Sequence, residues 1–396
     1  MSGRPRLRAG LGGLALAALL GGCATSPFDP PPPRPAEVRA QIVALMPASV
    51  ADREGWAVDI HAAFAALDIE PSTSNLCAVL AVTEQESTFR ADPAVPNLGK
   101  IARAEIDRRA GQAGVPAFAV DLALQIRSPD GRSYADRIVA VKTEKDLSAL
   151  YEDFTGMVPL GQRLFAGFNP VRTGGPMQVG IGYAEQLAKE RGYPYPVAVS
   201  IRHEVFTRRG GMYFGIAHLL AYPANYDSPL YRFADFNAGQ YASRNAAFQN
   251  ATSLASGIAL VRDGDLVIRG GAEAKPGATE LAVRALGRKI GLGDAEIRRA
   301  LQQDASGEFE KLPMYLRVFE LAEKTEGRPL PRAMVPDITL SSPKITRKLT
   351  TEWFARRVEE RYKRCLARAT PAAASRSAPP RLARAEGARV DQGERP

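Results

Sequence analysis

The sequence predicts a mainly α-helical protein. Between residues 37 and 368, apolar side chains recur mostly at spacings of three and four, which is the period of an α-helix. Ser, Thr or Asp stands at the start of several of these stretches, as is typical of helix N-caps. Alternating apolar and polar runs are sparse, which excludes a β-barrel or a β-sandwich.

The first helices of this body are marked by their start signals. Ser49, with Asp52 three residues later, gives a start that resembles a capping box. The helix that follows has an apolar stripe made of Trp56, Ile60, Phe64 and Leu67. Residues 71–74 end this helix and cap the next one, 74–89, which is apolar on most sides. A helix of that kind is expected in the centre of the fold.

More helices are predicted further along the chain, and the β signal is confined to two places. The helical stretches are expected at 98–110, 116–127, 145–154, 177–191, 201–222 and 229–248. A short β-rich run covers 138–141. A minor β-hairpin is expected where the turn Asp263-Gly264-Asp265 joins 259–261 to 266–268.

The chain is predicted to end its folded part in a helix that carries a cysteine. Thr350 or Thr351 caps this helix, and an apolar residue recurs every four positions at Phe354, Val358, Tyr362 and Leu366. Cys365 lies beside this stripe, and Cys77 lies on the predicted central helix. In an oxidising compartment the two cysteines are compatible with one disulfide, if the two helices pack together. Two separate buried thiols are the alternative.

Residues 1–22 have the pattern of an export signal. Three arginines in the first eight residues precede a short apolar run at 11–20, which is too short to cross a bilayer of ~30 Å as a helix. The run ends in Leu20-Gly21-Gly22-Cys23, which resembles the lipobox of bacterial lipoproteins and implies that Cys23 is lipidated. Ala24 favours the outer membrane, with the protein facing the periplasm. The alternative is an ordinary signal peptide.

The segments that flank the body are not expected to fold by themselves. Residues 23–36 are rich in proline and predict a stiff tether, and residues 369–396 have almost no large apolar side chain and predict a disordered tail. Loss of the three signal arginines leaves +6 of the formal net charge of +9. A mildly basic exported protein suits an anionic polymer such as peptidoglycan with its stem-peptide carboxylates, whereas nucleic acid is not an expected partner.

Three short strings carry the functional signal. They are Glu86-Ser87-Thr88-Phe89, Gly175-Pro176-Met177-Gln178-Val179 and Phe236-Asn237-Ala238-Gly239. In this order they resemble the active-site signature of the lysozyme-like lytic transglycosylases, which reads E-S-x-F, G-L-M-Q and Y-N-A-G. The resemblance implies a lysozyme-like α-helical domain that cleaves the MurNAc–GlcNAc bond of peptidoglycan strands, with no cofactor. Phe236 departs from the family's Tyr and lacks its hydroxyl.

Glu86 is the predicted general acid. Val82 and Val79 lie four and seven residues before it, on the same face of the predicted helix. An apolar face removes water from the carboxyl and raises its pKa, as a general acid near neutral pH requires. The lysozyme glutamate, with a pKa of about 6, is an example. Glu84 points to a different face and is expected in solvent.

The second carboxylate of the site decides the reaction. Glycosidases use a pair of carboxylates that flank the bond, and the candidates here are Asp92, Asp227 and Asp235. None of them falls at a position that the matched motifs assign to a catalytic partner. The resemblance therefore favours a transglycosylase over a hydrolase. In such an enzyme Glu86 first protonates the glycosidic oxygen, then accepts the proton of the muramyl C6 hydroxyl, and a 1,6-anhydro product forms.

The resemblance also assigns the substrate-binding residues. It implies that Met177 packs against the acid, that Gln178 faces the sugar cleft, and that Phe236 and Asn237 contact the glycan. Ser87 either binds the substrate or is a polar residue at a helix end. Gly175-Pro176 is expected to form a loop that enters a helix. His61, His203 and His218 show no metal-ligand spacing, so no metal site is predicted.

The distance between the first two motifs predicts a large insertion. The family places its second motif a few tens of residues after the first, whereas Gln178 follows Glu86 after 92 positions. We therefore expect an insertion at about 93–171 that borders the cleft, within a catalytic domain at 37–260. A C-terminal helical subdomain is expected at 261–368. The alternative function is a non-catalytic lipoprotein that binds peptidoglycan or serves as a scaffold; no protein partner is predicted.

Overall fold

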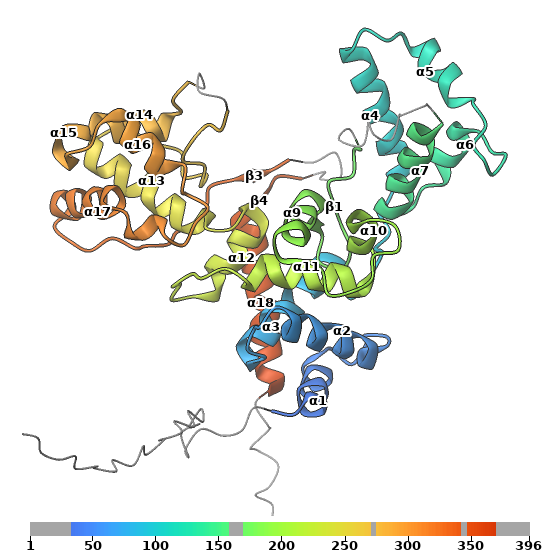
Figure 1. Cartoon of the computed structure of the whole chain (residues 1–396), viewed down its shortest axis with the longest axis horizontal. Helices are drawn as coiled ribbons and strands as arrows, with labels where there is room; N and C mark the ends of the chain where they lie inside the picture. The colour runs from blue at the N-terminus through green and yellow to red at the C-terminus, as the bar shows by residue number, and fades with distance from the viewer. Residues whose placement is uncertain (1–32, 158–168, 271–274, 342–346, 370–396) are drawn as a thin grey trace, which may run out of the picture. The chain divides into compact units, whose positions relative to one another are not determined.

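The computed structural model describes residues 33–157, 169–270, 275–341 and 347–369. The described residues are mainly helical, with two small two-stranded antiparallel sheets, so the predicted fold class is confirmed (Figure 1). The expected signal peptide, the lipidation at Cys23, most of the tether and nearly all of the C-terminal tail lie outside the described residues. Within the described residues, no helix has the length and apolar character needed to span a bilayer.

The first hydrophobic cluster contains the central helix and holds both ends of the described chain. Its main helices are α1 (Pro35–Leu45), α2 (Arg53–Ala66), α3 (Thr73–Ser87), α11 (Arg208–Leu220), α12 (Pro229–Ala238) and α18 (Thr351–Ala369). Helix α3 is buried on most sides, as its all-round apolar pattern predicts. It packs against α18, which in turn packs against α12. The last helix therefore belongs to the same cluster as the first ones.

The start of α3 follows the predicted cap, whereas the N-cap of α2 is Asp52 and not the predicted Ser49. Asp52 accepts a hydrogen bond from the backbone N–H of Gly55 (3.2 Å). Ser72 accepts one from Asn75 (3.2 Å), directly before the first residue of α3. Each side chain satisfies an N–H group that the helix itself leaves without a partner. The positions of these two helices are thus fixed by local sequence.

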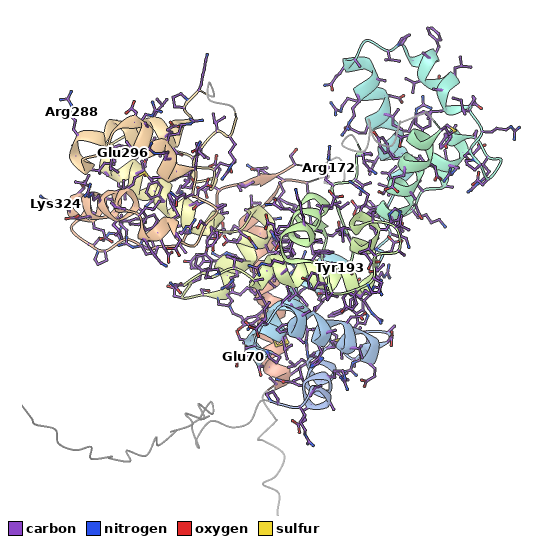
Figure 2. All side chains as sticks on the ribbon, viewed as in Figure 1. Glu70, Arg172, Tyr193, Arg288, Glu296 and Lys324 are labelled. Atoms are coloured by element: carbon purple, nitrogen blue, oxygen red, sulfur yellow. A yellow bond between two sulfur atoms is a disulfide. The ribbon has the colours of Figure 1, made fainter. Side chains whose placement is uncertain are left out.

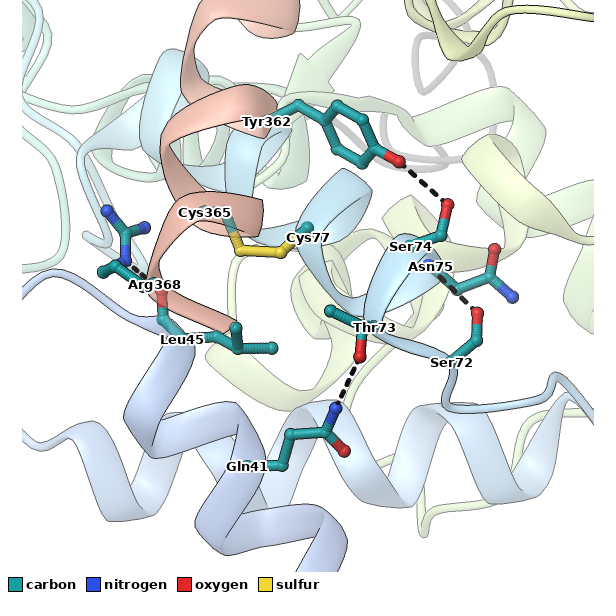
Figure 3. Close-up of a disulfide and its surroundings, with 10 residues drawn as sticks. All are labelled: Gln41, Leu45, Ser72, Thr73, Ser74, Asn75, Cys77, Tyr362, Cys365 and Arg368. Atoms are coloured by element: carbon teal, nitrogen blue, oxygen red, sulfur yellow. Dashed lines mark hydrogen bonds between the residues drawn. A yellow bond between two sulfur atoms is a disulfide. The ribbon is translucent and has the colours of Figure 1, made fainter. Parts of the chain in front are cut away.

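A disulfide joins α3 to α18. The Cα atoms of Cys77 and Cys365 are 5.5 Å apart and their sulfur atoms are bonded, as Figure 3 shows. Beside the bridge, the hydroxyls of Ser74 and Tyr362 are hydrogen-bonded at 2.9 Å, and Arg368 donates to the carbonyl of Leu45 at 2.7 Å (Figure 3). The two helices are therefore held by covalent and polar contacts as well as by apolar packing.

The expected insertion forms a second hydrophobic cluster of four helices. They are α4 (Leu98–Gln112), α5 (Ala117–Leu124), α6 (Tyr134–Ala140) and α7 (Glu144–Gly156). The β signal at 138–141 was wrong, because this run is the end of α6 and the residue that follows it. Ser133 caps α6 and Ile138 faces the cluster, while Val139 is 82% exposed. The run is helical because it packs against the cluster once per helical turn and pairs with no strand in the described residues.

Two short strands carry the second motif. Strands β1 (Thr173–Gly174) and β2 (Val179–Gly180) pair antiparallel. The predicted helix start at 177 was wrong, since α9 (Ile181–Arg191) begins after β2. The motif is thus the turn of a hairpin. After α9, the ring of Tyr193, labelled in Figure 2, stacks on Phe214 of α11 with centroids 5.1 Å apart.

Two predicted long helices are each divided. The stretch 201–222 consists of α10 (Ile201–Val205) and α11, because Thr207 caps a new helix there. The stretch 229–248 is divided at Gly239, whose φ of 115° no helix can continue, into α12 and α13 (Ala242–Ser256). Apolar periodicity runs through both breaks, so periodicity alone does not reveal them.

A third hydrophobic cluster gathers the helices after α12. They are α13, α14 (Ala278–Ala285), α15 (Gly287–Ile290), α16 (Asp294–Leu301), the 3₁₀ helix η2 (Phe309–Lys311) and α17 (Pro313–Glu326). Strands β3 (Thr339–Leu340) and β4 (Leu349–Thr350) pair antiparallel before α18. The expected C-terminal subdomain at 261–368 overlaps this cluster, whereas α13 joins it from the preceding segment and α18 returns to the first cluster.

The hairpin predicted around Asp263-Gly264-Asp265 was wrong, because neither 259–261 nor 266–268 is a strand. The side chain of Gln249 occupies the turn instead. It accepts from the N–H of Gly264 (2.8 Å) and donates to the side chain of Asp263 (2.8 Å) and to the carbonyl of Asp265 (3.1 Å). Polar groups of this turn are satisfied by a helix side chain and not by a partner strand.

Candidate active site around Glu86

Glu86 is the last residue but one of α3. Val79 and Val82, which share its face, are completely buried. Glu86 is partly exposed as a residue, but protein atoms surround its carboxyl group. The chain then leaves the helix sharply, since Thr88 (φ 51°) and Phe89 (φ 58°) both adopt left-handed backbone conformations. Conformations of this kind in residues other than glycine gather at functional sites.

The environment of Glu86 favours its protonated form. Burial, together with the smaller effect of the negative charge of Glu144, raises the pKa of its carboxyl to about 8. At neutral pH the carboxyl therefore holds a proton that it can donate. A general acid for glycoside cleavage needs this property.

Glu144 is the carboxylate that acts on Glu86, and it comes from the insertion. It is the first residue of α7 and is only 6% exposed. Backbone pairing fixes its position: Ala94 and Thr143 form an antiparallel bridge, and the N–H of Val95 donates to the carbonyl of Lys142 (2.9 Å). The segment that follows α3 is thereby paired with the residues directly before Glu144. Reasoning from the sequence missed this residue.

Asp92 belongs to the same group of carboxylates. It is partly buried, and burial raises the pKa of its carboxyl, with the charges of Asp146 and Glu144 acting in the same direction. A hydrogen bond with the Thr143 side chain opposes this shift. Of the three second carboxylates considered from the sequence, Asp92 is the one for which the structure gives a direct relation to the Glu144 end of α7.

Asp235 has a structural role in the fold. It is fully buried, and its carboxylate accepts hydrogen bonds from the hydroxyls of Tyr222 (3.0 Å) and Tyr226 (2.6 Å). It also accepts from the backbone N–H groups of Tyr241 (3.0 Å) and Ser243 (2.6 Å). The two backbone bonds hold α12 to the start of α13, and the two hydroxyl bonds hold it to the segment between α11 and α12. The remaining candidate, Asp227, is exposed in the loop before α12.

Glu84 faces α18, and its expected position in solvent was wrong, because its side chain is only 22% exposed. Its carboxylate is 3.1 Å from Arg364 and 3.6 Å from Arg361, both on α18. It therefore contributes an ion-pair contact between two helices of the first cluster. Two glutamates two residues apart thus have different surroundings, and only the one with the raised pKa is suited to acid catalysis.

The second motif is a tight turn packed on α11. Gly175 has a φ of 74°, and a Cβ at this position would overlap the carbonyl oxygen of Val205. Pro176 and Met177 approach Gly211 and Gly215 of α11 so closely that a side chain at either glycine would overlap them. Gly211 and Gly215 therefore allow the turn to pack on α11. Met177 is fully buried in this contact.

Gln178 is partly buried and is held in a strained turn conformation. Its φ is 50°, and its side-chain amide donates to the carbonyl of Gly175 at 3.2 Å. The hydroxyl of Thr173 donates to its amide oxygen at 3.5 Å. The side chain is thus oriented by the turn that carries it, and its partial exposure leaves it accessible.

The third motif lies at the end of α12, where its aromatic residue is packed. Phe236 is 9% exposed, and its ring meets that of His218 edge to face at 5.2 Å. His218 Nε2–H donates to the carbonyl of Phe236 (3.2 Å). Asn237 is partly buried and accepts from the Thr351 hydroxyl (2.8 Å). The motif therefore joins α11, α12 and the start of α18, and little of the Phe236 ring is open for stacking on a sugar.

Ser87 uses its hydroxyl within the chain. It is buried, donates to the carbonyl of Thr83 (3.1 Å) and accepts from the N–H of Arg90 (3.3 Å). These bonds support the end of α3 directly beside Glu86. They favour the structural reading of Ser87 over the substrate-binding one.

The three histidines have different surroundings. Burial lowers the pKa of His218 to about 4, so its ring is neutral near pH 7, and burial also lowers the pKa of His61. His203 contacts Ser200 through Nδ1 (2.8 Å) and Glu152 of α7 through Nε2 (3.3 Å), beside a cavity of about 360 Å³. In the described part of the chain, no three His, Cys, Asp or Glu side chains are arranged to hold a metal ion.

Comparisons with known proteins extend over most of the chain. The family model described as "Protein of unknown function (DUF1615)" matches residues 49–368. The chain is 53% identical over 360 residues to "Uncharacterized protein YaiW" of Escherichia coli (strain K12), and this covers 90% of the chain and 98% of that protein. No solved structure matches the chain. All three motifs lie within the residues that the family model covers.

Proposed function

The chain belongs to the DUF1615 family, and we propose that this member is a murein lytic transglycosylase that cleaves the MurNAc–GlcNAc bond of peptidoglycan. The observation that carries the proposal is the state of Glu86. It combines a motif position at the end of a buried helix, partial access to solvent and a pKa of about 8. Ser87 supports the helix end beside Glu86 through hydrogen bonds to Thr83 and Arg90.

In the proposed reaction, the Glu86 carboxyl acts twice. Its proton moves to the oxygen that links the two sugars, and the bond between that oxygen and C1 of the muramyl residue breaks. The resulting Glu86 carboxylate then takes the proton of the C6 hydroxyl of the same muramyl residue. The C6 oxygen bonds to C1, which closes the 1,6-anhydro ring and returns the proton to Glu86 without consuming water.

Glu144 keeps the first step possible near neutral pH. Its charge disfavours ionisation of Glu86, so the acid remains protonated while the substrate binds. The burial of Glu144 at the first position of α7 keeps it in place.

The presence of Glu144 also favours a second candidate function, a lysozyme-type hydrolase. Glycoside hydrolases place a pair of carboxylates on either side of the bond, and Glu144, whose charge acts on Glu86, is a candidate for the second member of such a pair. In a hydrolase, water attacks C1, and the product has a reducing end in place of an anhydro ring. From the sequence, Asp92, Asp227 and Asp235 were considered for this role and the transglycosylase was favoured, whereas Glu144 was not among the candidates.

Product analysis separates these functions. Purified full-length protein is incubated with sacculi, and the released muropeptides are analysed by mass spectrometry before and after borohydride reduction. A transglycosylase gives 1,6-anhydromuramyl products that borohydride does not change. Reducing ends would support the hydrolase. Absence of both, under conditions in which a known transglycosylase is active, would overturn the enzyme and leave a non-catalytic peptidoglycan-binding lipoprotein.

A further inference from the structure

A cavity of about 890 Å³ opens where α4 begins and α6 ends, in the insertion. Gly99 allows the two helices to approach closely, because a Cβ there would overlap the carbonyl oxygen of Ile138. The walls contain apolar side chains, among them Val95, Leu98 and Val141. Ligand sites of small molecules typically have volumes of about 300–1,000 Å³. The space is therefore of the size that a short peptide or a similar ligand fills.

Three cationic side chains line this cavity. Arg90, Lys100 and Lys142 are all exposed, and none forms an ion pair with an acidic side chain in the described ranges. The remaining pair of charges in the wall is already matched, since Arg103 contacts Asp107 at 3.0 Å. The cavity thus offers three cations without a described anionic partner.

The cavity lies along the chain next to the proposed active site. Arg90 follows Glu86 by four residues in the sequence, and Lys142 precedes Glu144 by two residues. Ala94 lines the cavity and is bridged to Thr143, directly before Glu144. The pairing that fixes the second carboxylate therefore also forms part of the cavity wall. Short segments of the chain therefore connect the cavity lining to both Glu86 and Glu144.

We propose that the cavity binds the stem peptide of peptidoglycan, with Arg90, Lys100 and Lys142 contacting its carboxylates. The inference rests on the proposed function, because it assumes a glycan strand at Glu86. A stem peptide is short, carries several carboxylates and is otherwise small and partly apolar. Those properties match the three cations and the apolar wall. An inorganic anion alone would leave the apolar wall and most of the volume without contacts.

Binding of a free peptide tests this proposal. Isothermal titration calorimetry measures the affinity of the full-length protein for the tetrapeptide L-alanyl-γ-D-glutamyl-diaminopimelyl-D-alanine. The double variant Lys100→Gln, Lys142→Gln is expected to bind at least about ten-fold more weakly, since charged hydrogen bonds are lost. The control is Lys189→Gln, on an exposed position of α9 outside the cavity. Equal affinity of the double variant and the wild type would overturn the proposal.

Two further measurements identify the ligand chemistry. A tetrapeptide with amidated carboxyl groups is expected to bind at least about ten-fold more weakly than the free acid, and equal binding would overturn the role of the cations. Inorganic phosphate is titrated in parallel. If phosphate binds as tightly as the tetrapeptide, the cavity is an anion site without peptide specificity, and the proposal fails.

The same variants separate this inference from the proposed function. The double variant is expected to raise KM for peptide-bearing strands more than for strands stripped of peptides by an amidase. Peptide binding without any anhydro product would overturn only the transglycosylase. Anhydro product with no preference between the two kinds of strand, and no peptide binding, would overturn only the cavity proposal.

Discussion

Cys77 of α3 and Cys365 of α18 are joined by a disulfide, although 288 residues separate them in the sequence. The bridge lies on the same helix as Glu86, so the candidate acid is carried by an element that is covalently tied to the end of the folded chain (Figure 3). A disulfide persists in an oxidising compartment. The bridge therefore agrees with the export signal that the first 22 residues predict.

Loss of this disulfide should destabilise the protein without removing Glu86 from its helix. The chain-entropy model gives about 5–6 kcal/mol for a loop closed over a separation of 288 residues, as an upper figure. We expect Cys77→Ser to lower the free energy of unfolding by a few kcal/mol in urea denaturation, and dithiothreitol to do the same to the wild type. Alkylation of both Cys77 and Cys365 in the unfolded, unreduced protein would show that no bridge forms.

Glu86→Gln should abolish turnover and leave the fold intact. The amide has the shape of the carboxyl but donates no acidic proton, and loss of a general acid typically costs about 10²–10⁴ in rate. Release of anhydromuropeptides is the measurement. Glu84→Gln is the matched control, because it makes the same chemical change on the same helix at a side chain that contacts α18. If Glu84→Gln lost activity and Glu86→Gln kept it, the assignment of the acid would be wrong.

Local signals were sufficient to predict much of the helical framework. The cap at Ser72 and the start of α18 at Thr351 are fixed by residues next to the helix, and the α2 cap was predicted three residues too early, at Ser49 in place of Asp52. The breaks at Thr207 and Gly239 and the failed hairpin near Gly264 depend on other elements. A contact between a helix side chain, such as Gln249, and a turn cannot be predicted from the local sequence pattern.

The candidate site could be predicted only in part, for a related reason. The pattern of Val79, Val82 and Glu86 on one helix face is local, and it leads to the raised pKa of the acid. Glu144 has no motif, and its effect on Glu86 depends on the pairing of Ala94 with Thr143 across the insertion. Sequence periodicity contains no information on such a contact, although the start of α7 could be found from its capping residues.

Glu144→Gln should move the pH dependence of turnover. The charge of Glu144 raises the pKa of Glu86, so its removal lowers that pKa and Glu86 loses its proton at a lower pH. The alkaline limb of kcat against pH is expected to shift downward, with little change at acidic pH. Asp153→Asn is the control, on an exposed position of the same helix. If the alkaline limb of kcat against pH did not shift, the effect of the Glu144 charge on the pKa of Glu86 would be contradicted. Loss of turnover at every pH would indicate that Glu144 acts directly on the substrate.

The titration of Glu86 should also appear in the stability of the protein. The pKa of Glu86 rises from 4.5 to about 8 on folding, so the folded state binds more protons than the unfolded state between these values. Stability linked to this group is therefore lost as pH rises from about 4.5 to 8. At roughly 1.4 kcal/mol per pH unit the upper limit is about 5 kcal/mol. Urea denaturation at pH 5, 7 and 9 should show that Glu86→Gln gains stability relative to the wild type as pH rises. If the difference in free energy of unfolding between the two proteins were the same at all three pH values, the raised pKa of Glu86 would be contradicted.

Gly175→Ala should disrupt the turn that carries Gln178. The φ of 74° costs a residue with a Cβ about 1–2 kcal/mol, and overlap with the Val205 carbonyl oxygen adds to that cost. We expect a lower midpoint of thermal unfolding and a lower rate on sacculi, because Met177 and Gln178 leave their places on α11. Gly182→Ala is the control: it lies at the start of α9 with no neighbouring atom near its added Cβ. There alanine should be neutral or stabilise by up to about 1 kcal/mol. Equal effects of the two substitutions would mean that close packing of the turn on α11 does not hold the second motif.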